Sequence, residues 1–229
     1  MERIKERLRT GQETTWIFYG GSSCQGAFHT HGWRDYGEIF EERVRFELHR
    51  PLDVMINNAF SGNTTRDLLS SFGRRIEQFK PDVVFLMVGL NDCNPEREVS
   101  LQEFETNLQE LQRRIASWGG LMVVQTAQPI APGGSPAREQ TFDAYMDILR
   151  KVAKETNSPL IDHTDIWRRY AKQPAYWMSD ALHPNQYGHL FFAHTLFRAL
   201  GIFDPDTSAV CRHLVPARAG LNAELENLY

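Results

Sequence analysis

Three side chains in this sequence of 229 residues could together carry out nucleophilic acyl transfer: Ser22, Asp180 and His183. A serine hydroxyl is a weak nucleophile and needs an adjacent base, most often a histidine. His183 suits that role, because its unperturbed pKa of about 6.5 leaves the ring mostly neutral at physiological pH. Asp180 lies three residues earlier, close enough on a turn to accept a hydrogen bond from the other ring nitrogen and so to hold one tautomer.

The same chemistry needs hydrogen-bond donors that are already in place for the developing oxyanion. The backbone N–H groups of Ser22 and Gly62 and the side-chain amide of Asn91 are the candidates. Gly62 has no side chain to keep a ligand away from its N–H, and an asparagine amide carries two donor hydrogens.

Taken one at a time, these residues have simpler explanations. Ser22 suits the N-cap of a helix, Asn91 and Asp92 suit a turn, and Asp180 and His183 suit a surface ion pair. Their positions relative to the predicted strands decide between the two interpretations.

Five short apolar or β-branched runs predict strands, and most of them end just before one of these residues. They cover residues 15–19, 53–57, 83–88, 121–124 and 160–161. Helices are predicted between them, at residues 2–8, 34–49, 101–117, 138–156, 165–171 and 186–200, with one more ending near residue 79. The alternation favours a parallel sheet with helices on both faces, in which the segments that follow the strands meet at one edge. Ser22, Gly62, Asn91 and His183 can therefore converge.

Composition indicates one soluble globular domain. Hydrophobic residues make up 41% of the chain, and its net charge of −4 argues against a nucleic-acid-binding surface. No repeat or break in composition marks a second domain, so we expect one domain over residues 1–203 and a polar, loop-like tail over 204–225. Residues 226–229 resemble the start of a cleavable tag linker.

The four segments that carry these residues resemble the conserved blocks of the SGNH or GDSL hydrolases. Gly20–Gly26 is similar to the block Gly-Asp-Ser-x-x-x-Gly, and Asn57–Thr64 to the block that carries an oxyanion glycine. Gly89–Asp92 is similar to Gly-x-Asn-Asp, and Asp180–Asn185 to Asp-x-x-His-Pro-Asn. Together the resemblance covers roughly residues 16–200.

The resemblance implies an α/β fold of three layers, flavodoxin-like, with a parallel five-stranded sheet in the order 2-1-3-4-5. It also implies ester hydrolysis with Ser22 as nucleophile, His183 as base and Asp180 as the partner that orients it. Gly21 departs from the family pattern, which has aspartate there, so the bracing of the nucleophile loop is in question. Ser23 is an alternative nucleophile, although the spacing to Gly26 favours Ser22.

Four further residues are candidates for lining a substrate pocket: His29, His31, Trp33 and Trp177. The substrate expected from the resemblance is a small-molecule ester, first of all an O-acetylated sugar. No cofactor, metal, nucleic acid or membrane span is expected. The charged start of the chain lacks the apolar core of a signal peptide and the cysteines are few, so a cytoplasmic location is predicted. A homo-oligomer is possible.

Three other functions stay open at this point. The first is a lysophospholipase or thioesterase type of acylhydrolase, and the second is a catalytically weak ligand-binding module, suggested by Gly21. The third is a metal-dependent phosphoesterase that uses Asp92, His29, His31 and His183.

Overall fold

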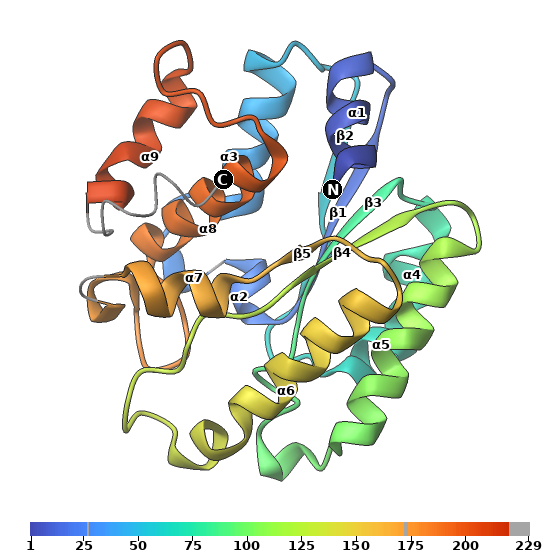
Figure 1. The fold of residues 1–229 in the computed structure, drawn as a ribbon, viewed down its shortest axis with the longest axis vertical. Helices are drawn as coiled ribbons and strands as arrows, with labels where there is room; N and C mark the ends of the chain where they lie inside the picture. The colour runs from blue at the N-terminus through green and yellow to red at the C-terminus, as the bar shows by residue number, and fades with distance from the viewer. Residues whose placement is uncertain (27, 172–173, 220–229) are drawn as a thin grey trace.

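The computed structural model describes residues 1–26, 28–171 and 174–219, and its centre is a five-stranded parallel sheet (Figure 1). The strands are β1 (Thr15–Gly20), β2 (Val54–Asn57), β3 (Val83–Met87), β4 (Leu121–Gln125) and β5 (Leu160–Ile161). They pair in the order β2-β1-β3-β4-β5, and each pair of hydrogen-bonded neighbours is parallel. The predicted fold class and strand order are confirmed.

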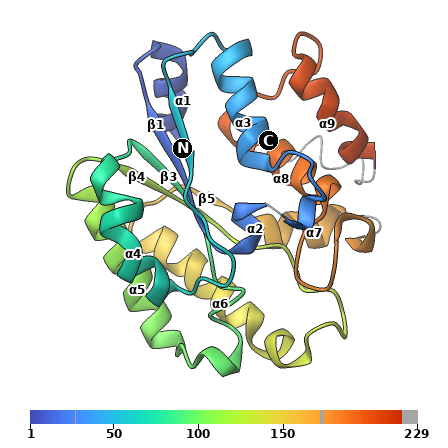
Figure 2. The same ribbon diagram turned by 180° about the vertical axis from the view of Figure 1, so that it is seen from behind.

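Alternation along the strands divides the core into two layers, because successive side chains of a strand point to opposite faces of the sheet. On β1, Trp16 and Phe18 face one cluster of buried residues, and Ile17 and Tyr19 face the other. The first cluster is covered by α3 (Tyr36–Glu42), α7 (His163–Tyr170), α8 (Gln186–Leu200) and α9 (Ala209–Ala219), with Ile4 of α1 (Glu2–Thr10) at its end. The second is covered by α4 (Thr65–Arg75), α5 (Leu101–Ala116) and α6 (Pro136–Glu155). Figures 1 and 2 show these two groups of helices on opposite sides of the sheet.

The helices next to the site begin where a side chain can satisfy their first free N–H groups. Asp35 accepts hydrogen bonds from the N–H groups of Gly37 and Glu38 and so begins α3. Asp162 accepts from the N–H of Asp165, which begins α7 two residues before the predicted start. The predicted helix over residues 34–49 is divided into α3 and a π-helical segment, η2 (Arg43–Glu47).

The end of the chain differs from the prediction. Residues from 204 onward were expected to form a polar, loop-like tail, but α9 packs on α8 and buries Val210, Cys211 and Leu214 in the first core cluster. Glu47 also accepts a 3.1 Å hydrogen bond from the backbone N–H of Val210. The segment around α9 therefore belongs to the packed fold. The tag remnant predicted at 226–229 lies outside the described residues.

No helix in the described ranges combines the length and the apolar character needed to span a bilayer.

Candidate active site

The turn that carries Ser22 is shaped by close contact between β1 and β3. A Cβ added at Gly20 would lie 1.8 Å from the carbonyl oxygen of Met87, so only glycine fits there. The N–H of Gly21 donates to the same oxygen at 3.2 Å. Directly after it, Ser22 opens the single helical turn α2 (Ser22–Gln25), at the carboxyl edge of the sheet. Open α/β folds bind ligands at this edge.

Ser22, His183 and Asp180 form a hydrogen-bonded chain. The Oγ of Ser22 lies 3.0 Å from Nε2 of His183. On the other side of the ring, Nδ1 of His183 lies 2.8 Å and 2.9 Å from the two carboxylate oxygens of Asp180. Nδ1–H can donate to the carboxylate while Nε2 accepts the serine proton, which is the arrangement that general-base activation of a serine requires.

The loop that carries His183 is folded around the Asp180 carboxylate. Oδ1 of Asp180 accepts hydrogen bonds from the N–H groups of Leu182, at 2.8 Å, and His183, at 2.9 Å. Burial raises the pKa of Asp180. The two backbone hydrogen bonds and the neighbouring His183 lower it by more than burial raises it, so the pKa lies below its ordinary value. The carboxylate is therefore ionised near neutral pH and can stabilise a positive charge on His183.

Asn185 fastens the far end of this loop. Its side-chain oxygen accepts from the N–H groups of Tyr187 and Gly188, which caps α8, and its Nδ2 donates to the carbonyl of Tyr176 at 2.8 Å. The Asp-x-x-His-Pro-Asn spacing thus has a structural meaning: it links a turn built on a carboxylate to a helix cap.

Two of the three candidate oxyanion donors meet at a shallow hollow beside the nucleophile. Ser22 and Asn91 both line it, together with Asn63, the residue after Gly62. Nδ2 of Asn91 donates to the carbonyl of Asn63 at 3.0 Å, and its second hydrogen is free to point elsewhere. Gly62 has a φ of +84°, which glycine adopts without strain, but it does not line the hollow itself.

The loops that hold Gly62 and Asn91 are tied together by Asp92. Oδ1 of this buried residue accepts hydrogen bonds from both N and Oγ1 of Thr65, each at 2.7 Å, at the start of α4. Burial raises the pKa of Asp92 to about 6, although the bonds from Thr65 oppose that effect. Asp92 therefore acts as a structural link between two loops.

Gly21, where the family usually has aspartate, lies against the side chain of Asn91. A Cβ at this position would be 3.3 Å from Nδ2 of Asn91 and 3.7 Å from the carbonyl oxygen of Asn63. Glycine offers Asn91 no side-chain partner at position 21. The side chain of Asn91 is held instead by its hydrogen bond to the carbonyl of Asn63.

The hydroxyl of Ser23 pairs with Gln128, whereas that of Ser22 pairs with the candidate base. Its side chain is buried, and its Oγ accepts a 3.0 Å hydrogen bond from Nε2 of Gln128. The same Nε2 donates to the carbonyl oxygen of Leu182, so Gln128 joins the turn of the nucleophile to the loop of His183. Sequence reasoning missed Gln128, although it follows β4 by three residues and could have been found by the argument that identified the other segments.

The predicted pocket residues lie in different environments. The ring of His29 packs on His183, and Nε2 of His31 lies 3.3 Å from Oγ of Ser179. Trp33 is exposed at a separate cavity. The expectation for Trp177 is wrong: only 5% of it is exposed, because it packs against Trp167 and Phe191 in the core.

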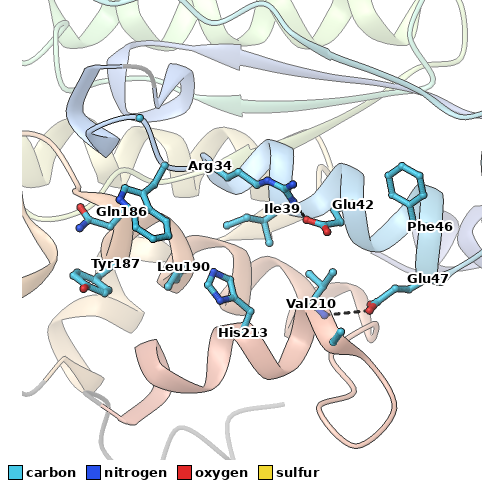
Figure 3. Close-up of a pocket in the computed structure, with 13 residues that line it drawn as sticks. Arg34, Ile39, Glu42, Phe46, Glu47, Gln186, Tyr187, Leu190, Val210 and His213 are labelled. Atoms are coloured by element: carbon cyan, nitrogen blue, oxygen red, sulfur yellow. Dashed lines mark hydrogen bonds and ion pairs between the residues drawn. The ribbon is translucent and has the colours of Figure 1, made fainter.

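That separate cavity measures about 770 Å³ and lies between α3, α8 and α9 (Figure 3). Ile39, Phe46, Leu190 and Val210 give it apolar walls, and Arg34 and Glu42 form an ion pair at its edge. Ser22 and His183 do not line it. It is therefore distinct from the hollow beside the nucleophile.

His29, Asp180 and His183 bring three metal-ligating atoms within 4.8 Å of one another. A histidine nitrogen binds a metal along its lone pair, which lies in the ring plane, at about 2.0–2.1 Å. The two rings are parallel to within 3° with their centres 3.6 Å apart, so no single ion can lie in both ring planes. This arrangement does not favour the metal-dependent alternative.

Comparison with known proteins agrees with the geometry. A sequence profile of the GDSL-like Lipase/Acylhydrolase family matches residues 18–190. The chain is 29% identical over 157 residues to an acetylxylan esterase of Geobacillus stearothermophilus, covering 64% of this chain and 72% of that protein. It is 23% identical over 212 residues to an isoamyl acetate-hydrolyzing esterase 1 homolog of Mus musculus, covering 81% and 82% of the two chains.

Solved structures give the same result for the fold. LAE5, an alpha/beta hydrolase enzyme from the metagenome of Lake Arreo, superposes with a TM-score of 0.70 at 27% identity, over 83% of this chain and 96% of its own. Axe2, an acetylxylan esterase from Geobacillus stearothermophilus, gives 0.66 at 23% identity, over 82% and 94%. The profile match spans most of the chain, and the chain therefore belongs to the GDSL-like lipase/acylhydrolase family, as a serine ester hydrolase.

Proposed function

We propose that this esterase removes small acyl groups, above all O-acetyl groups from carbohydrates, through an acyl-enzyme on Ser22. The observation that carries the proposal is the 3.0 Å contact between Oγ of Ser22 and Nε2 of His183, with Nδ1 of His183 held on Asp180. A hydroxyl, a base and an orienting carboxylate in this order are what acyl transfer to serine needs.

In the proposed reaction, Oγ of Ser22 attacks the acyl carbon while its proton moves to Nε2 of His183. The negative charge forms on the carbonyl oxygen, where the N–H of Ser22 and the amide of Asn91 stabilise it, with the N–H of Gly62 as the third candidate donor. The tetrahedral intermediate then breaks its bond to the alcohol oxygen, which takes the proton from His183. Water repeats the sequence on the acyl-enzyme, giving up a proton to His183, and the carboxylic acid leaves as Ser22 regains its proton.

The size of the hollow supports a small acyl group. It measures about 10 Å³, close to the room that one water molecule needs, which leaves no space for a long acyl chain. The names of the two relatives described above also refer to acetate esters.

An exposed ring beside the base supports a carbohydrate on the alcohol side. Phe28 is 87% exposed, and its ring lies perpendicular to that of His29, which stacks on His183. Exposed aromatic rings offer flat apolar surfaces of the kind that the faces of a sugar ring can cover.

The test compares p-nitrophenyl acetate, p-nitrophenyl butyrate and an acetylated xylooligosaccharide as substrates of the wild type, Ser22→Ala and Ser23→Ala. We expect Ser22→Ala to lose at least about 10³-fold in kcat and to escape labelling by a fluorophosphonate. Ser23→Ala, the control for the alternative nucleophile, should still be labelled by the fluorophosphonate and lose at most about 100-fold in kcat, because it removes only a hydrogen bond from Gln128. Equal rates for Ser22→Ala and the wild type would refute the nucleophile, and faster turnover of butyrate would refute the small acyl site.

A further inference from the structure

A second imidazole lies flat against the candidate base. The ring of His29 is parallel to that of His183 to within 3°, with the ring centres 3.6 Å apart. Both rings are directed at one carboxylate: Nδ1 of His183 lies 2.8 Å from Oδ2 of Asp180, and Nδ1 of His29 lies 3.8 Å from the same oxygen. The general acid–base chemistry described above does not use His29, so its close contact with the reacting ring needs its own explanation.

The turn that presents His29 is held in an unusual backbone conformation. Phe28 and His31 have φ values of +42° and +54°, in the left-handed region that side chains other than glycine seldom adopt. Such residues persist where surrounding contacts fix them, and they are frequent at functional sites. Here His31 contacts Ser179, the residue before Asp180, and the ring of Phe28 meets His29 edge to face at 5.1 Å. The turn is therefore fastened to the loop of the base.

Burial and the neighbouring His183 both favour the neutral form of the His29 ring. Burial lowers the pKa of His29 first, and the nearby His183 lowers it further, while Asp180 opposes both effects. The other titratable groups that act on His29 are His31, on the same turn, and buried His189 on α8. When a proton reaches His183, the neighbouring ring is thus neutral and offers a π face to the imidazolium, which avoids repulsion between two cations.

We propose that His29 is a positioning residue for the base. Its neutral ring covers one face of His183, so that the imidazole cannot rotate about its Cβ–Cγ bond without colliding with it. Nδ1 then stays on Asp180 and Nε2 stays on Ser22, at the distances given above. The inference rests on the proposed function, because it requires His183 to be the base that acts on Ser22.

The test uses His29→Ala, which removes the ring, and His29→Phe, which keeps a flat ring but no nitrogen. With p-nitrophenyl acetate we expect His29→Ala to lower kcat about 10- to 100-fold with little change in KM, since small misplacements of a catalytic group cost that much. His29→Phe should recover to within about threefold of the wild type. The downfield Nδ1 proton resonance of His183 should be retained in His29→Phe and broadened or lost in His29→Ala.

His49→Asn is the matched control, because His49 is exposed and lies before the amino end of β2, whereas the site lies at the carboxyl ends of the strands. It should leave kcat unchanged. A wild-type kcat in His29→Ala, or equal losses in His29→Phe and His29→Ala, would overturn the stacking role. Thermal melting of each variant separates this effect from unfolding. If His29→Ala does not fold, His29→Gln takes its place with the same expected loss.

Ser22→Ala and His183→Ala are measured alongside. If either keeps wild-type activity, the proposed function fails, whatever the His29 variants do. If both are inactive and His29→Ala is not impaired, the positioning inference alone fails.

Discussion

The hydrogen bonds of Gln128 predict a variant that damages catalysis without touching any group of the reaction. Nε2 of Gln128 donates to Oγ of Ser23 and to the carbonyl oxygen of Leu182, the neighbours of Ser22 and His183. Methionine has nearly the same length and volume but cannot donate. Gln128→Met should therefore keep the packing and remove the link between the two catalytic loops.

Two separate losses follow from removing this amide. Leaving a buried acceptor unsatisfied costs about 1–3 kcal/mol, whereas the loss of Oε1 of Gln128, a buried acceptor with no partner among the described residues, offsets part of that cost. We expect the free energy of unfolding to fall by about 1–3 kcal/mol in total. In addition, Gln128 no longer joins the turn of Ser22 to the loop of His183, so the 3.0 Å contact between these two residues is less firmly fixed. A misplacement of about 1 Å can cost 10²-fold, so kcat should fall about 10- to 100-fold.

The assay is kcat for p-nitrophenyl acetate together with urea unfolding of the same samples. Gln125→Met is the matched control, because Gln125 is equally buried and also makes two side-chain hydrogen bonds, at 3.1 Å each, to Tyr36 and His163. It should lose similar stability with a smaller loss of kcat. If Gln128→Met lowers kcat no more than Gln125→Met does, the link between the loops has no catalytic role.

Gln128→Glu adds a dependence on pH to the same test. A protonated glutamic acid can donate to the carbonyl of Leu182, whereas an ionised one places a negative charge against it. Burial raises the pKa of such a carboxyl group. The ratio of kcat/KM for Gln128→Glu to that of the wild type should therefore fall as the pH rises, and a flat ratio would contradict the assigned donor.

Three further predictions concern the triad, the strand turn and acid stability. Asp180→Asn should lower kcat about 10⁴-fold in a folded enzyme, because an amide facing Nδ1 of His183 favours the wrong tautomer; a loss below tenfold would refute that role. Gly20→Ala should cost about 3 kcal/mol in urea unfolding, since its Cβ meets the carbonyl oxygen of Met87 at 1.8 Å; unchanged stability would contradict the close approach of β1 and β3. Burial lowers the pKa of His163 to about 3, so between about pH 6.5 and 3 the unfolded chain binds a proton that the folded chain does not. His163 then lowers stability by about 1.4 kcal/mol per pH unit as the pH falls, and His163→Gln should lose that slope in urea unfolding at pH 7, 5.5 and 4.5.

Site residues that directly follow the end of a strand could be predicted from the sequence. Apolar runs locate strands, parallel strands bring their carboxyl ends to one edge, and Ser22 and Asn91 each follow such an end. The predicted approach of the Ser22 hydroxyl to the His183 imidazole is present at 3.0 Å. The catalytic roles of these residues, and of Gly62, stay predictions until variants are measured.

The sequence could not predict which way individual side chains turn. Trp177 lies in the short helix η5 (Pro174–Trp177), where no alternation distinguishes inside from outside, and packing against Trp167 draws it into the core. The helix α9 follows a polar segment, and apolar residues make up most of its sequence, so no one-sided apolar stripe marks the face that buries Val210 and Leu214. Their partners lie in other helices, α7 and α8 for Trp177 and α8 for α9, so the pattern within each segment alone carries little information about them.

The spacing of Asp180 and His183 shows how much a short motif can specify by physics alone. A carboxylate that accepts the N–H groups two and three residues later closes a tight turn, and the side chain of the third residue comes back over that carboxylate. The N–H of Ser179 donates to the carbonyl of His183 at 2.8 Å and locks the same turn from outside. The short spacing therefore supplies both the backbone geometry and the pairing of carboxylate and imidazole. The contacts that hold this turn beside the nucleophile, from Gln128 and His29, come from other segments and become visible only in three dimensions.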